Sequence, residues 1–346
     1  MPSQHNDTGR RPATMRDVAT MAGVGIATVS RVVNGKPVTP DLAERVKRAA
    51  ESLGYRQDLT ASSLRRADRR TSTLGLVLED AANPFSAALH RAVEDAAAER
   101  GMLLLAGSTD EDPARERDLL RTFTARRVDG LIVVPTGRND ADLDAAHRAG
   151  TPVVCVDRRT SASEVDTVTV DNRGGVRAAV RSLFEAGHRR IAFLGDLRSI
   201  WTAEERHMGF VEGLAGVGCV LHPSLVRRGL HGAEAAQEAA RELLALAHAP
   251  TAFVSGQNLL TVGARRALQE LGLQRRVALI GFDDLPLADL LEPGLSVIAQ
   301  DHDVIGREAA GLLFERLGGE VGPARHRVLP TRYLARGSGE LSAPEG

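Results

Sequence analysis

The chain has 346 residues, of which 43% are hydrophobic and 26% are charged, and its formal net charge is −1. A chain of this length and composition buries sizeable cores and is expected to form more than one domain. No apolar run reaches the ~18 residues of a membrane span, and the polar start lacks the apolar stretch of a signal peptide, so we expect a cytoplasmic protein.

The charge is unevenly distributed along the chain. Residues 1–70 contain 13 Lys and Arg against 7 Asp and Glu, a formal charge of +6, which leaves −7 for residues 71–346. A basic head on an acidic body is typical of a protein that contacts a polyanion with one end only. A solvated, disordered basic tail is the alternative, but this segment carries apolar periodicity.

The first part of the chain is predicted to be helical. Residues 1–12 are polar, and we expect a disordered tail there. Residues 13–58 contain three short helical patterns. The first starts at a capping-box-like Thr14 and stops at Gly23, which gives a tight turn. The third is expected to start with Thr39 as its cap.

The second helix is expected over residues 26–34. Its periodicity places on one face Ile26, Ala27, Ser30, Arg31 and Asn34, and on the other Val29, Val32 and Val33. Three helices with a Gly-containing turn between the first two predict a helix-turn-helix, whose second helix enters the major groove of DNA. The alternative is a helical packing module that binds no nucleic acid, and the basic charge argues against it.

From residue 72 onwards, apolar β-type runs alternate with amphipathic helical patterns. The expected strands are residues 73–78, 102–106, 130–134, 152–156, 165–170, 190–194, 251–255, 277–281 and 296–300. The expected helices include residues 85–100, 115–127, 174–186, 233–247 and 259–271, and glycines suited to a C-cap are Gly101, Gly150, Gly187 and Gly272. The repetition predicts parallel sheets covered by helices on both faces, and about nine strands suit two sheets better than one.

Motifs along the whole chain resemble the LacI/GalR family of bacterial regulators. They are 15–19 (MRDVA), 22–24 (AGV), 28–35 (TVSRVVNG), 53–55 (LGY), 83–85 (NPF), 128–132 (VDGLI), 171–172 (DN), 174–175 (GG), 205–206 (ER), 209–210 (GF), 281–284 (GFDD) and 336–338 (RGS). The resemblance implies an α + α/β fold: a three-helix helix-turn-helix head and a two-subdomain, doubly wound α/β body like the periplasmic binding proteins.

The resemblance also implies a domain organisation. The expected parts are a tail (1–12), a helix-turn-helix DNA-binding domain (13–58), a hinge helix and linker (59–71), an effector-binding and dimerisation domain (72–339) and a second tail (340–346). Within the large domain, one subdomain takes residues 72–170 plus 301–328, and the other takes 171–300 plus 329–339.

The family's DNA contacts carry over onto matching positions. The expected DNA-binding residues are Thr14, Ile26, Ala27, Thr28, Ser30, Arg31, Asn34 and Leu64. By the resemblance, Arg31 reaches a guanine edge, and the hydroxyl and amide side chains of the second helix hold phosphates. Ile26 and Ala27 stand where family members vary their base readers. Gly25 departs from the family's usual serine cap.

The bridge between head and body resembles the family's hinge helix. In relatives this helix folds on the operator and inserts a leucine into the central minor groove. Residues 60–66 (TASSLRR) match it, and Leu64 matches the leucine. The pairs at 57–58 (QD) and 61–62 (AS) depart from the family's usual residues. A flexible linker is the alternative.

By the same resemblance, a small-molecule effector lies in the cleft between the subdomains. The expected effector-binding residues are Phe85, Ser86, Asp157, Arg158, Trp201, Thr202, Arg206, His231, Gln257, Asn258 and Asp283. A carboxylate and an Arg in one cleft bind vicinal hydroxyls, so we expect a sugar or a related metabolite. Trp201 either packs on the ligand or belongs to the core, and His231 has a structural role as its alternative.

The implied function is that of a homodimeric repressor which an effector releases from a near-palindromic DNA operator. A corepressor-dependent repressor and a solute-binding protein are the alternatives. No GxGxxG or GxxxxGK[ST] motif follows a strand, so we expect no enzyme. Cys155 and Cys219 lack metal-ligand spacing and are interpreted as buried small hydrophobes; no metal or cofactor is expected.

Overall fold

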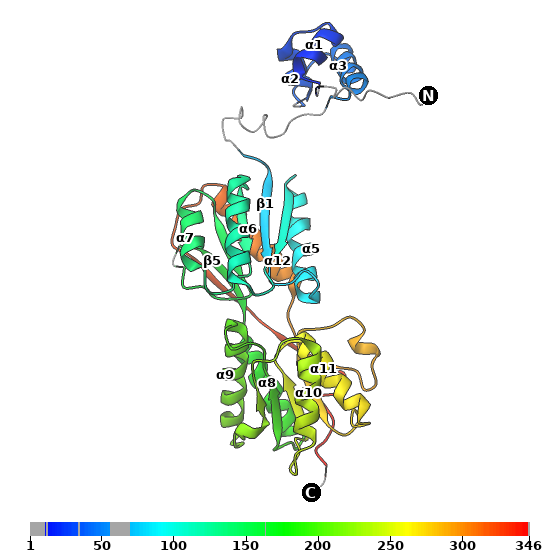
Figure 1. Ribbon diagram of the computed structural model, residues 1–346, viewed down its shortest axis with the longest axis vertical. Coiled ribbons are helices and arrows are strands. Elements are labelled where there is room, and N and C mark those ends of the chain that lie inside the picture. Colours follow the sequence, from blue (N-terminus) through cyan, green and yellow to red (C-terminus); the bar gives the residue numbers. More distant parts are fainter. Residues whose placement is uncertain (1–10, 12, 34, 56–69, 163, 345–346) are drawn as a thin grey trace, which may run out of the picture. The chain divides into compact units, whose positions relative to one another are not determined.

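The computed structural model describes residues 11, 13–33, 35–55, 70–162 and 164–344 (Figure 1). The chain divides into two compact units, Met1–Thr71 and Ser72–Gly346. Within the described part, no helix is long and apolar enough to cross a membrane. The expected hinge, with Leu64, and also Asn34 lie outside the described residues.

The smaller unit is a three-helix head. Its helices are α1 (Met15–Ala22), α2 (Ile26–Val33) and α3 (Pro40–Leu53), and Val18, Val29 and Val46 form the centre of its core. The capping box of α1 is confirmed: Asp17 N donates to Thr14 Oγ1 (3.3 Å), and Thr14 N donates to Asp17 Oδ2 (2.8 Å).

The expected cap of α3 is wrong in one respect. Thr39 holds the N-cap position with an extended backbone, but its side chain accepts no capping hydrogen bond. Pro40, the first helical residue, has no N–H group, so this helix start needs one acceptor fewer than usual.

The larger unit contains two six-stranded sheets, each in its own lobe. The first lobe has the strand order β11-β5-β4-β3-β1-β2, and all neighbours are parallel. The bounds are β1 (Thr73–Leu78), β2 (Leu103–Ser108), β3 (Gly130–Val133), β4 (Val153–Val156), β5 (Asp166–Val170) and β11 (His326–Leu329). Helices α5 (Pro84–Ala98) and α12 (His302–Leu317) cover one face, and α6 (Pro113–Ala125) and α7 (Asp140–Arg148) cover the other (Figure 1).

The second lobe repeats this plan with the order β12-β10-β9-β8-β6-β7. The bounds are β6 (Ile191–Leu194), β7 (Val226–Arg227), β8 (Ala252–Ser255), β9 (Ala278–Phe282), β10 (Ser296–Ala299) and β12 (Arg332–Leu334), of which β12 runs antiparallel to β10. Helices α8 (Asn172–Glu185) and α9 (Trp201–Gly216) cover one face, and α10 (Gly232–Leu244) and α11 (Asn258–Glu270) cover the other.

The two doubly wound sheets and all nine expected strands are confirmed, with ends that differ by at most two residues. The four glycines expected at helix ends all have positive φ, between 65° and 95°. Of the two cysteines, Cys155 is buried as expected, but Cys219 is only half-buried. It lies in the turn after α9, where its thiol donates to the Arg189 carbonyl (3.2 Å).

Candidate functional site

The exposed surface of the head includes one side of α2. Ile26, Ala27 and Arg31 are exposed, whereas Val29 is fully buried against the other two helices. Thr28 and Ser30 are half-buried at the edge of this face, and Thr14 is half-buried at the start of α1. The head therefore presents one cation and two apolar tips on a short helix, a set that suits base edges and phosphates.

The turn between α1 and α2 is held from the third helix. Gly23 has φ +62°, and Arg45 of α3 donates from Nη2 to the carbonyls of Ala22 (2.8 Å) and Gly23 (3.2 Å). The end of α1 thus has its free carbonyls satisfied by a cation, which also suits the negative end of the helix dipole. This contact joins α3 to the turn between α1 and α2.

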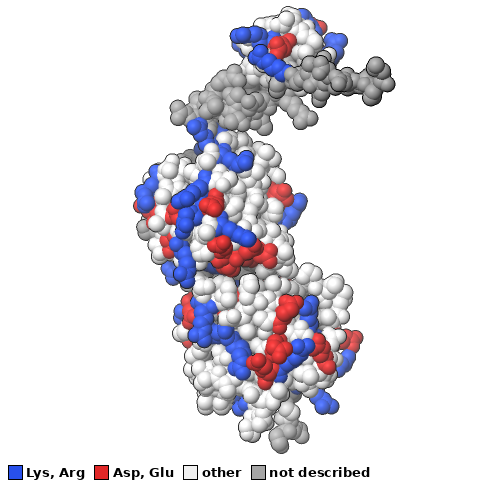
Figure 2. All heavy atoms as spheres, viewed as in Figure 1, with Lys and Arg blue, Asp and Glu red and all other residues white. Residues whose placement is uncertain are grey.

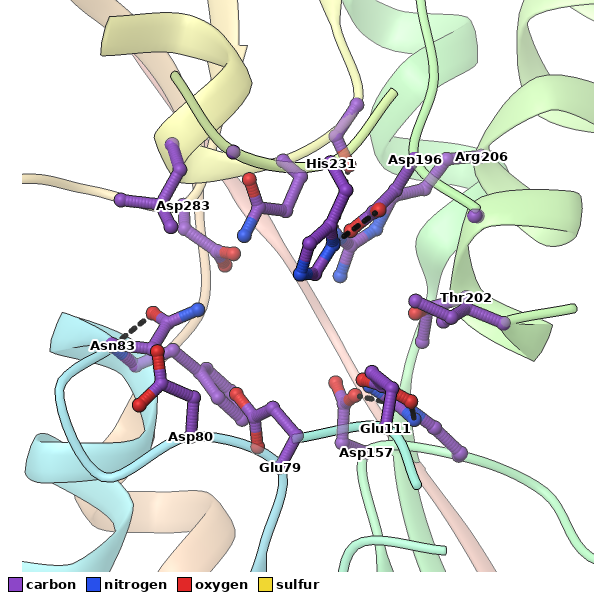
Figure 3. Close-up of a pocket in the computed structure, with 18 of the residues that line it drawn as sticks. Glu79, Asp80, Asn83, Glu111, Asp157, Asp196, Thr202, Arg206, His231 and Asp283 are labelled. Atoms are coloured by element: carbon purple, nitrogen blue, oxygen red, sulfur yellow. Dashed lines mark hydrogen bonds and ion pairs between the residues drawn. The ribbon is translucent and has the colours of Figure 1, made fainter. Parts of the chain in front are cut away.

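A pocket of about 220 Å³ lies between the two lobes of the larger unit. Parallel strands direct their carboxyl ends to the same edge of a sheet, and the loops that follow them line such crevices. The first lobe contributes Glu79, Asp80, Asn83, Phe85, Asp110, Glu111, Asp157 and Arg158. The second lobe contributes Asp196, Ile200, Thr202, Ala203, Arg206, His231, Gly232, Gly256, Gln257, Leu259 and Asp283 (Figure 3).

The pocket brings together eight of the eleven residues expected at an effector site. They are Phe85, Asp157, Arg158, Thr202, Arg206, His231, Gln257 and Asp283. The structure places the other three outside the lining. Ser86 is fully buried in α5, and Trp201 is half-buried as the first residue of α9. Asn258 instead joins the lobes, because its Nδ2 donates to Oδ1 of Asn83 (2.7 Å).

The two arginines of the pocket differ in which of their hydrogen-bond donors remain available to a ligand. Arg158 makes a two-pronged ion pair with Glu111 (2.6 and 2.8 Å), so its guanidinium is engaged within the first lobe. Arg206 donates from Nε to Asn172 (2.7 Å) and from Nη1 to the Gly256 carbonyl (2.9 Å). Its Nη2 makes no hydrogen bond to a described residue and remains available in the pocket.

Two aspartates hold equivalent positions in the two lobes. Asp157 follows β4 and Asp283 follows β9, and their φ angles are +69° and +70°. Each N–H donates across to the next strand of its sheet, to Val168 and Ile298 respectively (both 2.9 Å). A left-handed conformation is costly for a residue with a side chain and is found most often at functional sites. The fold therefore fixes two carboxylates against the pocket from opposite sides.

Burial changes the protonation of several carboxyl groups. It raises the pKa of Glu79 to about 7, against the opposing effect of the nearby Arg158. Burial also raises the pKa values of Asp157 and Asp196. Asp196 lies 3.5 Å from His231 Nδ1 and has no ion pair with a Lys or Arg among the described residues. The pocket thus holds negative charge that the protein only partly compensates.

Sequence reasoning missed most of these acidic residues. Glu79 and Asp80 follow β1 directly, Asp110 and Glu111 follow β2 within three residues, and Asp196 follows β6 within two. A polar residue at the carboxyl end of an apolar run is a signal that could have found them, since those ends meet at one edge of each sheet.

Comparison with known proteins covers both units. The sequence model described as bacterial regulatory proteins of the lacI family matches residues 14–58, and the model described as periplasmic binding proteins and sugar binding domain of the LacI family matches residues 71–335. The regulator CelR of Thermobifida fusca is 35% identical over 95% of this chain and 99% of its own. The repressor CytR of Escherichia coli is 30% identical over 94% and 96%. A solved CelR–cellobiose complex matches 95% of this chain and 100% of its own, with 33% identity and a TM-score of 0.71.

Proposed function

Because the chain belongs to the LacI family of bacterial regulatory proteins, we propose that it represses transcription until a sugar-type effector binds between its lobes. Family membership makes it a DNA-binding transcription regulator. The relative that is named a repressor supports repression, and the CelR–cellobiose complex supports a carbohydrate effector. A binding role, rather than catalysis, and a place in the cytoplasm with the DNA follow from this function.

The main support for the proposal is that residues of both lobes line one pocket. A ligand that contacts both lobes binds best to one arrangement of them, so it favours that arrangement at the expense of others. The operator favours the arrangement that positions two heads on adjacent half-sites. Effector and operator then weaken each other's binding by the same factor.

The chemistry of the pocket suits hydroxyl groups. Asp157 and Asp283 offer acceptors from opposite walls, and Arg206 Nη2 offers a donor from α9. Vicinal hydroxyls both donate and accept, so they pair with such a mixed set at little cost of unsatisfied groups. Phe85, 6% exposed at the start of α5, gives an apolar surface for the C–H face of a ring.

The head is proposed to read DNA with α2. Arg31 supplies a two-pronged donor for a guanine edge, and Ile26 and Ala27 make apolar contacts that set operator choice. Thr28 and Ser30 hold phosphates. Thr14 holds a phosphate or keeps the start of α1 in place. Asn34 and Leu64 keep the roles that the family resemblance gives them.

The assembly is proposed to be a homodimer. Strand β2 ends one side of its sheet and exposes Leu103 (66%) and Leu105 (37%) beside α5. Apolar side chains on an edge strand normally mark a covered surface. Two copies joined through this side of the first lobe have the symmetry that a near-palindromic operator requires.

The test joins operator binding to effector binding. Operator duplexes are selected from random DNA with the full chain, and melting temperature and operator affinity are then measured with a panel of neutral sugars, cellobiose included. A sugar that raises the melting temperature is expected to release the operator. Arg206→Ala should lose both effects, while Arg31→Ala should lose operator binding and keep the rise in melting temperature. A stabilising sugar that leaves operator affinity unchanged contradicts the proposal.

A further inference from the structure

The pocket between the lobes has a strongly acidic lining. Its lining contains seven carboxylates against two arginines and one histidine. On the face of the molecule seen in Figure 2, by contrast, Lys and Arg are interspersed with Asp and Glu. The lining of the pocket thus carries a local excess of carboxylates over cations.

Three of the seven carboxylates are compensated by arginines. Asp110 pairs with Arg115, Glu111 pairs with Arg158, and Asp157 lies 3.4 Å from Arg158 Nε. These pairs leave Arg206 as the one arginine of the lining without an ion pair to a described residue. Of the two arginines of the pocket, Arg158 is thus already paired with carboxylates of the first lobe.

The other four carboxylates have no ion pair with a Lys or Arg among the described residues: Glu79, Asp80, Asp196 and Asp283. Asp80 accepts from the Ala82 N–H (2.8 Å), and Asp196 accepts from the Leu197 N–H (2.7 Å) and faces His231. Asp283 accepts from the Gln300 amide. Two of the four come from each lobe, so a ligand at the centre has negative charge on both sides (Figure 3).

The imbalance of charge affects Glu79 most, because its carboxyl group is buried away from water. Its residue is only 9% exposed, and Oε2 has no hydrogen-bond partner in the part of the chain that the structure describes. The Ser86 hydroxyl lowers the pKa of Glu79 but forms no hydrogen bond of normal geometry with it. A buried acceptor without a partner costs free energy until a donor reaches it. Glu79 also lines the pocket, so its carboxyl group adds to the negative charge that a ligand meets there (Figure 3).

The arrangement does not suit a bare metal ion. In the described residues, no three His, Cys, Asp or Glu side chains come close enough together to hold one. The carboxylates are instead spread around the walls of the pocket (Figure 3). An anionic sugar would meet repulsion from both lobes.

We infer that the effector is an amine-bearing carbohydrate, whose ammonium group lies in the negative field of Glu79, Asp80, Asp196 and Asp283 while its hydroxyls meet Asp157 and Arg206. This inference rests on the proposed effector function of the pocket. An ammonium group carries three donors and one positive charge, and so supplies what the uncompensated acceptors lack. A neutral sugar supplies donors but leaves the charge in place.

The test compares amines with their neutral parents. Calorimetric titration of the full chain at pH 7 uses D-glucosamine, D-galactosamine and the deacetylated dimer chitobiose, each beside D-glucose, D-galactose or cellobiose and beside its N-acetyl derivative. At least one amine should bind tenfold or more tightly than its parent and its N-acetyl form. Neutral parents that bind as well as the amines overturn this inference and leave a sugar effector standing. If neither the amines nor the neutral parents bind, both this inference and the proposed sugar effector are wrong.

Variants locate the ammonium group. Glu79→Gln and Asp196→Asn should each reduce the ratio of amine to parent affinity at least fivefold. Asp118→Asn, an exposed carboxylate on α6 outside the pocket, is the matched control and should leave the ratio as it is. An equal ratio in all three variants, each with a cooperative melting transition, contradicts the assignment. The wild-type comparison decides the question if a pocket variant fails to fold.

Discussion

Replacing Glu79 with glutamine should stabilise the larger unit, and the gain should depend on pH. Burial raises the pKa of this carboxyl to about 7 in the folded chain, against an ordinary value of 4.5. Glutamine has nearly the same shape and is always neutral. The variant therefore resembles the protonated wild type, and its stability is never lowered by an ionised, buried carboxylate.

The sign and the size of this pH dependence follow from the linkage between folding and protonation. Between pH 4.5 and 7 the folded state binds more protons at Glu79 than the unfolded state does, so this group's contribution to stability falls as pH rises and levels off above pH 7. Each pKa unit corresponds to about 1.4 kcal/mol, which makes the full loss about 3 kcal/mol. Arg158 and Asp157, the charged groups that act most directly on Glu79, are already included in its pKa.

The assay is urea unfolding of the full chain at pH 4.5 and pH 8.5. Trp201 is the only tryptophan and lies in the larger unit, so its fluorescence reports the unfolding of that unit alone. The difference in unfolding free energy between Glu79→Gln and wild type should grow by about 3 kcal/mol from the lower to the higher pH. Glu185→Gln, at an exposed position on α8, is the control and should show no such growth. A difference that stays constant, or that favours wild type at pH 8.5, refutes the reasoning.

Three further predictions concern packing, capping and assembly. A methyl group at Gly263 would overlap the Ala233 carbonyl where α11 crosses α10, whereas one at Gly311 of α12 meets nothing. Gly263→Ala should therefore cost ~1–3 kcal/mol and Gly311→Ala should gain up to ~1 kcal/mol in urea unfolding; equal effects would show that the α10–α11 approach is looser than described. A Cβ at Gly25 also meets nothing, and its φ is not positive, so Gly25→Ser should cap α2 and raise the head's stability by a few tenths of a kcal/mol, read from its amide exchange; faster exchange in α2 would contradict this. Leu103→Asp should shift the chain from dimer to monomer in sedimentation at micromolar concentration, while Leu271→Asp, at another exposed position on the second lobe, should not; a dimer in both variants would place the interface elsewhere.

The strands were predictable where burial leaves a continuous apolar run. Strands β3 and β8 are buried at every position, and such runs have few other interpretations. Strand β11 carries no such signal, because three of its four residues are exposed. Strand β7 has only two residues, too few for any periodicity. Both lie at or near a sheet edge, where backbone pairing decides the conformation and side-chain pattern does not.

The site was predictable where a family position could be matched, and less so where orientation matters. Thr202 and Arg206 are four residues apart on α9 and so share the face that lines the pocket. Trp201 is one residue earlier, about 100° around the helix, and its side chain falls outside the lining. The carboxylates of Glu79 and Asp196 come from strands 110 or more residues apart in sequence, and only the folded lobes bring them to one cavity.

The discontinuous first lobe has a consequence for how the protein is made. Five of its six strands and α5 come from residues 72–170, but α12, which covers the same face as α5, begins only at His302, and the sixth strand, β11, follows it. At 5–20 residues per second, a ribosome needs roughly 7 to 26 s to add the intervening chain. Throughout that interval Leu89 and Val93 of α5, fully buried in the finished molecule beside Ile305 of α12, have no cover from that helix. Meanwhile most of the second lobe emerges as one uninterrupted stretch, so the lobe whose synthesis starts first is completed only near the end of translation.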